Sequence, residues 1–344
     1  MAGEIVDFFG LTLLELEAFL VENGFKPYNA GQIYDWVYQK KTRNIEKMSN
    51  LSKALRAFLP GKFFFAVPSV AEEHISGDGT TKYLLSLQDG NLIETVLLRH
   101  NYGNSLCVTS QVGCNMACTF CASGLKKRIR NLFASELVGQ IIAVESHTGF
   151  KISHVVVMGT GEPFDNYENV IKFIKIINEN KGLAIGQRHI TVSTCGIVPM
   201  ILRYADEPIR SNLAISLHAP NDKLRSRLMP INRKYPLPEL IHACETYFAK
   251  TSRRVTYEYI LLEGENDTDI HAMELANLLK EQNCYVNLIP YNRVSEFDFK
   301  PTDIDRAMRF VDLLMKRRIN VTLRKEQGSD IQAACGQLRL KNRS

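Results

Sequence analysis

Three of the chain's eight cysteines stand in the stretch GCNMACTFCASG, residues 113–124, where Cys114, Cys118 and Cys121 follow the spacing C-x-x-x-C-x-x-C. No other Cys or His occurs between Cys121 and His147, so a fourth local ligand is missing. A structural zinc site is usually closed by four ligands, and a four-iron cluster normally takes four cysteines. The spacing therefore indicates a metal centre with one coordination position left for another ligand, either an iron–sulfur cluster or a catalytic zinc.

The length and composition are typical of a soluble enzyme. The chain has 344 residues, of which 45% are hydrophobic and 23% are charged, so it can bury a large core without disulfides. No apolar run approaches the roughly 20 residues that cross a bilayer, and the N-terminus MAGEIVDFFG lacks the pattern of a signal peptide. We expect a cytoplasmic protein without membrane contact, in which clustered thiols bind metal or take part in catalysis.

The positive charge is unevenly distributed. The formal net charge is +5, while the first 100 residues are slightly acidic, so the surplus lies after residue 100. Basic clusters recur there: Lys126, Lys127, Arg128 and Arg130; Arg225 and Arg227; Arg233 and Lys234; Arg253 and Arg254; and Lys316, Arg317 and Arg318. Any one cluster is typical of a solvated helix end, but together they favour a polyanionic partner.

The periodicity divides the chain into three parts. Residues 1–66 contain helical patterns such as LTLLELEAFLVENGF, AGQIYDWVYQK and LSKALRAFL, and residues 67–104 change to a β-hairpin or short meander with turns at GDG and DG. In residues 105–344, strands alternate with helices. The expected strands are SLCVTSQV, HVVVMG, HITVST, NLAISLH, VTYEYILL, VNLIPYN and NVTLRKE. This alternation predicts an α/β fold built from parallel βαβ units.

Polar and glycine residues repeatedly follow the predicted strands. They include MGTGEP around Gly161 and Glu162, the pair Ser193 and Thr194, SLH at 216–218, and Asn292. The carboxyl ends of parallel strands meet at one edge, where α/β proteins build their sites. The cysteine stretch follows the first of these strands, so we expect it at the same edge.

The cysteine spacing in this context resembles the radical S-adenosylmethionine (radical SAM) superfamily, and MGTGEP resembles its Gly-Glu-Pro element. The whole chain is similar to the RlmN and Cfr group of RNA adenine methyltransferases. The motifs QVGCNMACTFCASG, VVMGTGEPFDN, HITVST, SLHAPND, SRLMPINR, YEYILLEGENDT, VNLIPYN and EQGSDIQAACGQL occur in that family's order. The resemblance implies a partial (β/α)6-type radical SAM barrel with a small helical N-terminal domain (1–66), a β-hairpin linker (67–104) and a barrel segment (105–344).

The resemblance also implies a role for individual residues. Cys114, Cys118 and Cys121 match the ligands of one [4Fe–4S] cluster. The positions matching contacts to S-adenosylmethionine are Gly161, Glu162, Ser193, Ser216, Leu217, His218 and Asn292. Cys335 matches the cysteine that is methylated, Cys107 its partner thiol, and Glu94 a proton acceptor near the substrate. Without the resemblance, Cys107 and Cys335 would be read as ordinary cysteines and Glu94 as an exposed hairpin residue.

The implied chemistry explains the two kinds of cysteine, because an aromatic C–H of adenine is too inert for ordinary methyl displacement. In the family's route one S-adenosylmethionine methylates Cys335, and a second yields a 5′-deoxyadenosyl radical that activates the S-methyl group. Cys107 and Cys335 then form a disulfide that releases the product. Either Glu94 or Cys107 could take the ring proton. The implied partners are 23S rRNA, tRNA and a flavodoxin- or ferredoxin-type electron donor, and we expect a monomer.

Several alternatives stay open at this point. RlmN-type enzymes methylate carbon 2 of adenine and Cfr-type enzymes carbon 8, and the intact GEP and SLHAPND elements favour carbon 2. A radical enzyme acting on a peptide or small molecule, and a zinc-bound RNA-binding module without catalysis, are two further alternatives. We also expect Cys195 near the cofactor, and we hypothesise that Trp36, Tyr38, Lys40 and Lys41 of the N-terminal domain contact RNA.

Overall fold

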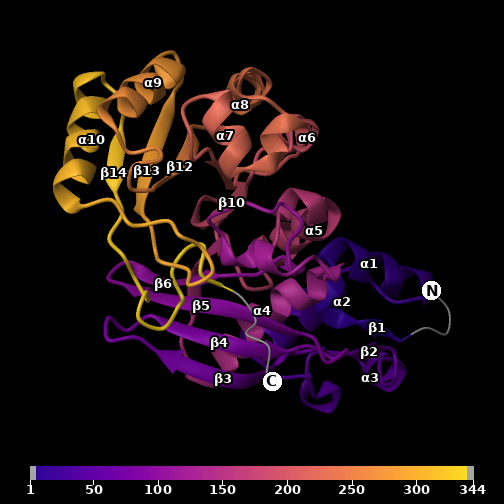
Figure 1. Cartoon of the computed structure of the whole chain (residues 1–344). Helices are drawn as coiled ribbons and strands as arrows, with labels where there is room; N and C mark the ends of the chain where they lie inside the picture. The colour runs from indigo at the N-terminus through magenta and orange to yellow at the C-terminus, as the bar shows by residue number, and fades with distance from the viewer. Residues whose placement is uncertain (1–4, 339–344) are drawn as a thin grey trace.

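The computed structural model describes residues 5–338, and its centre is one ten-stranded mixed sheet with the order β14-β13-β12-β11-β10-β9-β6-β5-β4-β3 (Figure 1). The parallel strands are β6 (Gly103–Cys107), β9 (Ile152–Val157), β10 (Ile190–Thr194), β11 (Asn212–Ser216), β12 (Val255–Leu261), β13 (Cys284–Pro290) and β14 (Val321–Leu323). β14 and β3 are the two edge strands of this order. The predicted α/β fold with a partial barrel is therefore confirmed.

Helices connect the parallel strands. They are α4 (Ala134–Thr148), α5 (Tyr167–Asn178), α6 (Val198–Asp206), α7 (Asp222–Leu228), α8 (Leu237–Thr251), α9 (Asp269–Leu279) and α10 (Ile304–Lys316). Their sequences explain both burial and ends. In α10, for example, the buried residues Ala307, Phe310, Val311 and Leu314 recur at helical spacing, and the Asp303 side chain caps the first turn. One face of such a helix packs on the sheet and the other meets water.

The other end of the sheet is antiparallel. β3 (Ser69–Ile75), β4 (Thr81–Ser86) and β5 (Leu92–His100) form a meander, and β5 pairs with β6. Gly79 and Gly90 occupy the turns with φ of +85° and +81°, as the GDG and DG signals predict. Because β6 pairs with β5 on one side and with β9 on the other, the meander extends the barrel sheet rather than standing apart from it.

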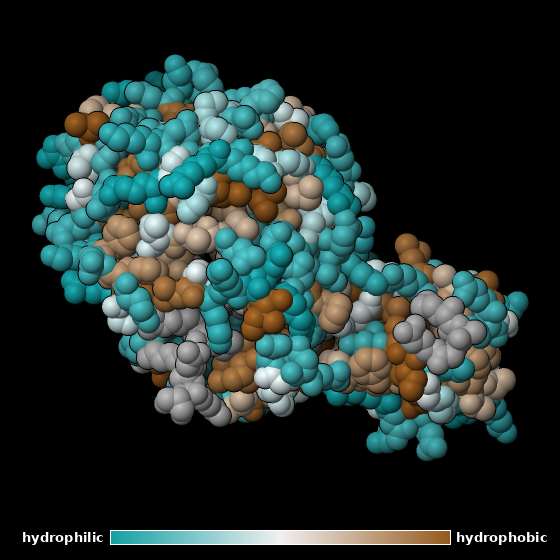
Figure 2. All heavy atoms as spheres, turned by 45° about the vertical axis from the view of Figure 1, so that its right-hand side comes forward, coloured by the Kyte–Doolittle hydropathy of each residue, from teal (hydrophilic) through white to brown (hydrophobic). Residues whose placement is uncertain are grey.

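The N-terminal residues form a small lobe beside this body (Figure 2). Its elements are β1 (Val6–Asp7), η1 (Phe8–Gly10), α1 (Leu13–Glu22), α2 (Tyr28–Tyr34), η2 (Asp35–Gln39), η3 (Ile45–Lys47), α3 (Lys53–Phe58) and β2 (Phe63–Phe64). Its core is aromatic: Phe8 lies within 6.2 Å, between ring centroids, of Phe9, Tyr34, Tyr38, Phe63 and Phe65. The predicted helical N-terminal part is thus confirmed in its secondary structure.

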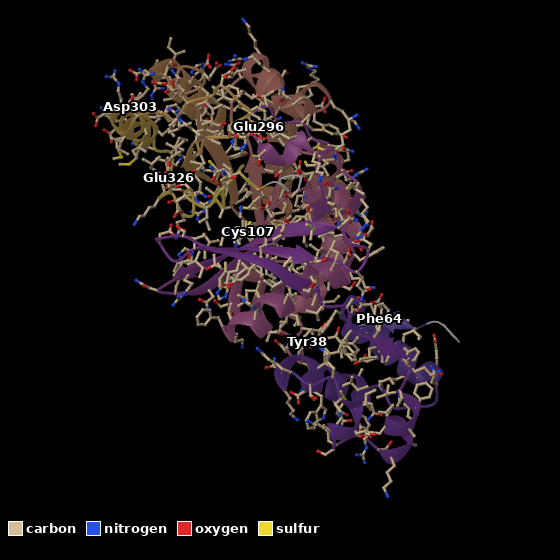
Figure 3. The ribbon with its side chains drawn as sticks, turned by 60° about the horizontal axis from the view of Figure 1, so that its bottom comes forward. Tyr38, Phe64, Cys107, Glu296, Asp303 and Glu326 are labelled. Carbon is tan, nitrogen blue, oxygen red and sulfur yellow. The ribbon has the colours of Figure 1, made fainter. Side chains whose placement is uncertain are left out.

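The lobe is fastened to the barrel through α4 and α5. Lys41 Nζ lies 3.0 Å from Glu145 Oε2 of α4, and Lys172 Nζ of α5 lies 2.7 Å from Glu15 Oε1. Tyr38 is 3% exposed and belongs to the aromatic core, near the junction of the two parts (Figure 3). The hypothesis that Tyr38 contacts RNA is therefore wrong, since its side chain is buried. For Lys41, whose side chain is 55% exposed beside Glu145, the hypothesis stays a prediction.

Two predicted strands are shorter in the structure. The first ends at Cys107 instead of Val112, because the backbone of Thr109 turns to bond with the Gln140 side chain of α4. The last ends at Leu323, and residues 324–338 continue as a loop. The domain boundaries at residues 66 and 104 stay predictions. None of the helices within residues 5–338 is long and apolar enough to traverse a lipid bilayer.

Candidate active site

The cysteine stretch forms a loop that is closed by its own backbone. β7 (Gln111–Val112) pairs with β8 (Arg130–Asn131), and Cys114 N donates to Lys126 O at 3.0 Å. Gly113, with φ of +80°, closes the loop tightly, because a Cβ at this position would lie 2.3 Å from Lys127 O. A glycine is required there. Bonds within residues 111–131 therefore close the loop at its base.

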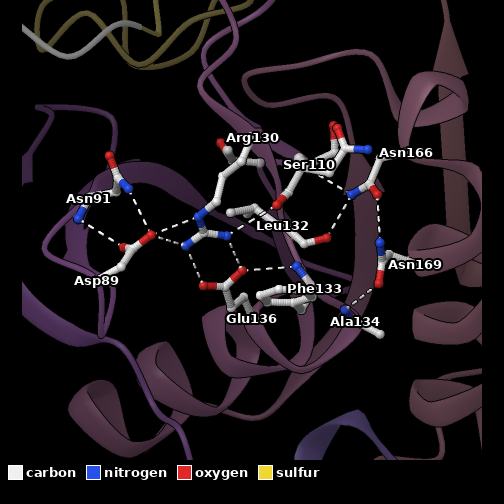
Figure 4. A network of polar contacts seen from close by, with 12 residues as sticks. Asp89, Asn91, Ser110, Arg130, Leu132, Phe133, Ala134, Glu136, Asn166 and Asn169 are labelled. Carbon is white, nitrogen blue, oxygen red and sulfur yellow. Dashed lines mark hydrogen bonds and ion pairs between the residues drawn. The ribbon is translucent and has the colours of Figure 1, made fainter.

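Arg130 anchors the base of this loop (Figure 4). Its guanidinium donates to Asp89 of the β4–β5 turn and to both carboxylate oxygens of Glu136, each at 2.7 Å. Glu136 also accepts from Phe133 N at 2.9 Å. The hydrogen bond with Glu136 raises the pKa of Arg130. Asn166 completes the anchor by bridging two backbone carbonyls, Ser110 O and Leu132 O, at 2.9 and 2.8 Å.

The three cysteines line one cavity of about 150 Å³ at the carboxyl ends of the parallel strands. Burial raises the pKa of Cys114 to about 12 and raises that of Cys118 well above its usual value, and the neighbouring thiols add to both shifts. Such thiols become thiolates when metal cations replace their protons. Three cysteines from one short loop that line one cavity fit the ligand set of an iron–sulfur cluster with one iron left open. No three His, Cys, Asp or Glu side chains within residues 5–338 are grouped as ligands of a single metal ion.

The same cavity, which we call the cluster cavity, also collects most of the predicted cofactor contacts. Its lining includes Gly161, Glu162, Ser193, Ser216 and His218. Gly161 has φ of +110°, and a Cβ there would lie 2.7 Å from Ser110 Oγ and from the Gln111 side chain, so the backbone follows a path open only to glycine.

Two buried ionisable groups shape the cluster cavity. Burial raises the pKa of Glu162, whose carboxylate accepts from Cys195 N at 2.7 Å and Phe164 N at 3.0 Å. Burial also lowers the pKa of His218 to about 3, so its imidazole is neutral and its Nδ1 accepts from Ile260 N at 3.0 Å. Each group thus has a fixed orientation towards the cavity.

Leu217 differs from its neighbours because it does not line the cluster cavity. Its side chain is fully buried, its N–H donates to Glu258 O at 3.0 Å and its carbonyl accepts from Arg225 Nε at 3.1 Å. Cys195 also lines this cavity, and Cys244 and Cys284 are buried elsewhere.

A second cavity, of about 200 Å³, adjoins the first, and we call it the thiol cavity. It is lined by Cys107, Asn292, Arg324 and Cys335, and Cys335 lines the cluster cavity as well. Figure 3 places Cys107 on the sheet, far from the N-terminal lobe. Burial, and then the nearby Cys335 thiol, raises the pKa of Cys107 to about 12. Asn292 Oδ1 is buried and has no hydrogen-bond partner, so it is available to a ligand.

The loop carrying Cys335 is held by distant parts of the chain. Asp330 accepts from Ser76 Oγ at 2.6 Å and from Gly77 N at 3.2 Å, at the β3–β4 turn. On the other side, Gly336 O accepts from Ala122 N at 2.8 Å and Leu338 O accepts from Ser123 Oγ at 2.9 Å. The meander and the cysteine loop therefore hold this segment between them.

Glu94 lies in β5 and is 6% exposed, so the reading of an exposed hairpin residue is wrong. Its Oε1 lies 3.2 Å from Lys82 Nζ, and Lys82 also donates to Gln332 O at 3.2 Å in the Cys335 loop. Glu94 belongs to neither cavity lining. It is connected to the thiol cavity through Lys82 and through Val96, its neighbour on the same face of β5, which lies opposite Cys107.

Sequence reasoning missed Lys82, Arg225 and Arg324. The β4–β5 register could have paired Lys82 with the face of β5 that carries Glu94. Arg225 lies three and four residues before the buried Leu228 and Met229, which predicts an inward-facing arginine. Arg324 follows a strand end, but no local signal distinguishes it from a surface arginine.

Comparisons with known proteins agree with this geometry. Residues 108–276 match the radical SAM superfamily, and residues 6–63 match the ribosomal RNA large subunit methyltransferase N-terminal domain. A probable dual-specificity RNA methyltransferase RlmN of Bacillus licheniformis is 53% identical over 332 residues, covering 96% of this chain and 92% of the relative. Its counterpart in a Thermoanaerobacter species is 52% identical, covering 96% and 97%. The crystal structure of a radical SAM methyltransferase from Sphaerobacter thermophilus is 44% identical, with a TM-score of 0.90, covering 97% and 99%.

Proposed function

Because the chain belongs to the RlmN family of radical SAM RNA methyltransferases, we propose that it methylates carbon 2 of an adenosine in 23S rRNA and of an adenosine in tRNA. The observation that carries this proposal is the position of Cys335, which lines both the cluster cavity and the thiol cavity. A residue that receives a methyl group from a cofactor and passes its carbon to RNA needs access to both the cofactor and the RNA, and Cys335 has access to both cavities. Each turnover uses two molecules of S-adenosylmethionine.

The enzyme uses a [4Fe–4S] cluster and S-adenosylmethionine, as radical SAM enzymes do. We assign the cluster to Cys114, Cys118 and Cys121, which share one cavity. When bound, the cluster supplies the electron that makes S-adenosylmethionine a radical source, and S-adenosylmethionine also supplies the methyl group. The protein contributes the buried thiols and keeps bulk water from them.

We assign the amine end of S-adenosylmethionine to Glu162, whose buried carboxylate is held by two backbone N–H groups. Gly161 lets the backbone approach the cofactor, and Ser193 and Ser216 offer hydroxyl groups in the same lining. His218 offers a neutral imidazole there. Two further residues lie outside that lining: Asn292 offers its unpartnered carbonyl from the thiol cavity, and Leu217 holds Ser216 and His218 in place through its bonded backbone.

The two catalytic thiols have different tasks. The Cys335 thiolate takes the methyl group from the sulfonium, and the bond from its sulfur to the transferred carbon is broken when Cys107 attacks that sulfur and forms a disulfide. This oxidised pair must then be reduced by a thiol reductant. Supporting this assignment, both cysteines line the thiol cavity, and each is a free thiol in the structure.

Glu94 and Cys107 are the two candidates for the group that takes the ring proton. Glu94 is an acceptor held by Lys82, while the pKa of about 12 for Cys107 keeps that thiol protonated at neutral pH. The raised pKa of Cys107, and not the position of Glu94, which lines neither cavity, therefore favours Glu94 as the acceptor. Glu94→Gln should then stall turnover after the carbon is attached to RNA and leave a covalent protein–RNA adduct on a denaturing gel. Cys107→Ala should leave the same adduct in any case, because it removes the thiol that releases the product. Normal turnover by Glu94→Gln would therefore favour Cys107 as the acceptor.

RNA is expected to approach over the exposed segment that follows the cysteines. Lys126 and Lys127 are exposed there, and Ile129 and Phe133 expose apolar side chains at 59% and 61%. Lysines bind phosphates, and an exposed aromatic ring can stack on an unpaired base. We further propose that the enzyme acts as a cytoplasmic monomer with a flavodoxin- or ferredoxin-type electron donor.

Anaerobic turnover followed by mass spectrometry of nucleosides tests the proposal. Purified enzyme, S-adenosylmethionine and a reductant are incubated with unmodified 23S rRNA fragments and with tRNA. We expect 2-methyladenosine in both RNAs from the wild type and in neither from Cys335→Ala. Methylation at carbon 8 would contradict the assigned position, and an unchanged tRNA would contradict dual specificity.

A further inference from the structure

Arg225 is a fully buried arginine whose hydrogen-bond acceptors are all neutral. It lies on α7 with 0% of its surface exposed. Its guanidinium donates to Leu217 O at 3.1 Å, Ser216 O at 3.1 Å, Cys195 O at 2.7 Å and Asn232 Oδ1 at 2.9 Å. The hydrogen bonds are therefore satisfied, whereas the charge is not neutralised by direct contact with a carboxylate.

A buried cation without a partner charge is energetically costly. Asp222, on the same helix, does not meet the guanidinium: its carboxylate accepts from Asn232 Nδ2 and from Leu237 N, both at 2.8 Å. Asn232 thus stands between the two charges. Burial lowers the pKa of Arg225, in keeping with an unfavourable site for the cation. A further negative charge close to this guanidinium would therefore stabilise the folded protein.

The cysteine loop is the place where such a charge would arise. Thr119 N donates to Leu228 O at 2.9 Å, which ties the loop to the C-terminal end of α7. Cys195, whose carbonyl accepts from Arg225 at 2.7 Å, lies on the same cavity wall as Cys118. Both residues line the cluster cavity. The guanidinium therefore lies directly behind the wall of the cluster cavity, where its positive charge favours the negative charge of a cluster bound in that cavity.

Arg225 also joins two strand ends. Cys195 follows β10, and Ser216 and Leu217 lie at the end of β11, so one side chain fixes the spacing between the segments that carry Ser193, Ser216 and His218. Because its forked donors reach both strands, the guanidinium is fixed in orientation. Its charge is therefore held at a constant place beside the cysteine loop.

We propose that Arg225 is the buried counter-charge of the iron–sulfur cluster: its fixed guanidinium raises the reduction potential of the cluster while joining the ends of β10 and β11. Reduction adds negative charge to a site that already carries three thiolates, and a nearby cation stabilises the reduced form. Arg225 is a positioning residue, since it acts through its charge and through the backbone at the ends of β10 and β11. The proposal rests on the cluster and does not depend on which RNA atom is methylated.

The test compares Arg225→Gln, which removes the charge, with Arg225→Lys, which keeps it beside an anionic cluster but loses the forked donors. Arg227→Gln is the matched control, because Arg227 lies on the same helix, is largely exposed and pairs with Glu265. Each protein is reconstituted anaerobically without RNA. Iron and sulfide content, a redox titration followed by electron paramagnetic resonance, and the melting temperature of the apoprotein are measured.

At the potential where half of the wild-type cluster is reduced, we expect less than one tenth to be reduced in Arg225→Gln, a shift of about 59 mV or more for one electron. Arg225→Lys should stay within about twofold of the wild-type ratio of reduced to oxidised cluster, and Arg227→Gln should match the wild type. If Arg225→Lys incorporates the cluster and Arg225→Gln does not, this result would also show that the charge at this position stabilises the cluster. If the Gln and Lys variants behave alike, in loading and in potential, the charge has no role and the proposal is overturned.

Discussion

The cysteine loop and the Cys335 loop adjoin the same two cavities but are held in opposite ways. The cysteine loop is closed by bonds within residues 111–131, including the β7–β8 pair and the bond from Cys114 N to Lys126 O. The Cys335 loop instead depends on Ser76, Ala122, Ser123 and Arg293, which lie far away in the sequence. The first is closed by local bonds and has a recognisable spacing, with added bonds to Asp89 and Leu228, while the second is held by bonds to distant parts of the chain.

This contrast predicts that damage to the two loops has different consequences. A ligand change in the cysteine loop removes the cofactor itself, whereas a change in the Cys335 loop leaves the cofactor bound and interrupts transfer. The four experiments below test this separation, in order of decreasing effect.

Cys118→Ala should abolish every activity. Two thiols cannot replace three as cluster ligands, so the reconstituted protein should lose most of its iron and sulfide, its brown colour and its cleavage of S-adenosylmethionine. Cys284→Ala is the control, because Cys284 is buried in β13 away from both cavities. Full iron content in Cys118→Ala would exclude Cys118 as a ligand.

Cys335→Ala should abolish RNA methylation while it retains the cluster. Iron content and the spectrum of the reduced cluster should match the wild type, because Cys335 is not among the proposed ligands. The methyl group on residue 335, detected by mass spectrometry of the peptide that contains it, should be absent in the variant. Loss of iron in this variant would mean that the Cys335 loop also contributes to cluster binding, so the functions of the two loops could not be separated.

Asp330→Ala should lower turnover on the order of tenfold without changing iron content. It removes the bonds to Ser76 and Gly77 that hold the Cys335 loop on the β3–β4 turn. Hydrogen exchange of residues 326–338 should rise, whereas exchange in residues 111–131 should not. Asp312→Ala, on the exposed face of α10, provides the matched control. Equal turnover in the two variants would show that the anchor is dispensable.

Ser123→Ala should have the smallest effect. It removes the side-chain bond from the cysteine loop to Leu338 O, and leaves the backbone bond from Ala122 N to Gly336 O in place. One such bond contributes about 1 kcal/mol to stability, so denaturant unfolding should shift by that amount. Turnover should fall by no more than about threefold. A loss as large as that of Asp330→Ala would make this contact, and not the meander, the main support.

The sequence predicted the features that are local. The alternation of strands and helices, the turns at Gly79 and Gly90 and the gathering of Gly161, Ser193 and His218 at the strand ends all follow from periodicity and parallel pairing. The place of Cys335 beside Cys107 could not be derived in this way, because it results from bonds across more than 200 positions of the chain. Only the family resemblance selected it.

Long-range contacts also explain the other errors. Glu94 has the pattern of a half-exposed strand residue, and its burial arises from Lys82 and from the loop bonded to Lys82. Tyr38 lies in a helical segment with an amphipathic pattern, and its burial arises from Phe8 and Phe9 at the start of the chain. In both cases the tertiary partner, and not the local sequence, decides the environment.

The contact between α4 and the N-terminal lobe fixes the distance between the lobe and the two cavities. Lys41 is paired with the buried Glu145 at one end of α4, and a Cβ on Gly139, in the middle of the helix, would lie 3.4 Å from the backbone oxygen of Ala66 at the end of the lobe. The same helix begins beside Arg130 and the cysteine loop. Helix α4 therefore acts as a rigid spacer between the lobe and the cavities. An RNA that contacts both the lobe and the cavities must place its target base at that distance from the part that contacts the lobe. RNAs of different sequence can meet this requirement if their folded shapes agree.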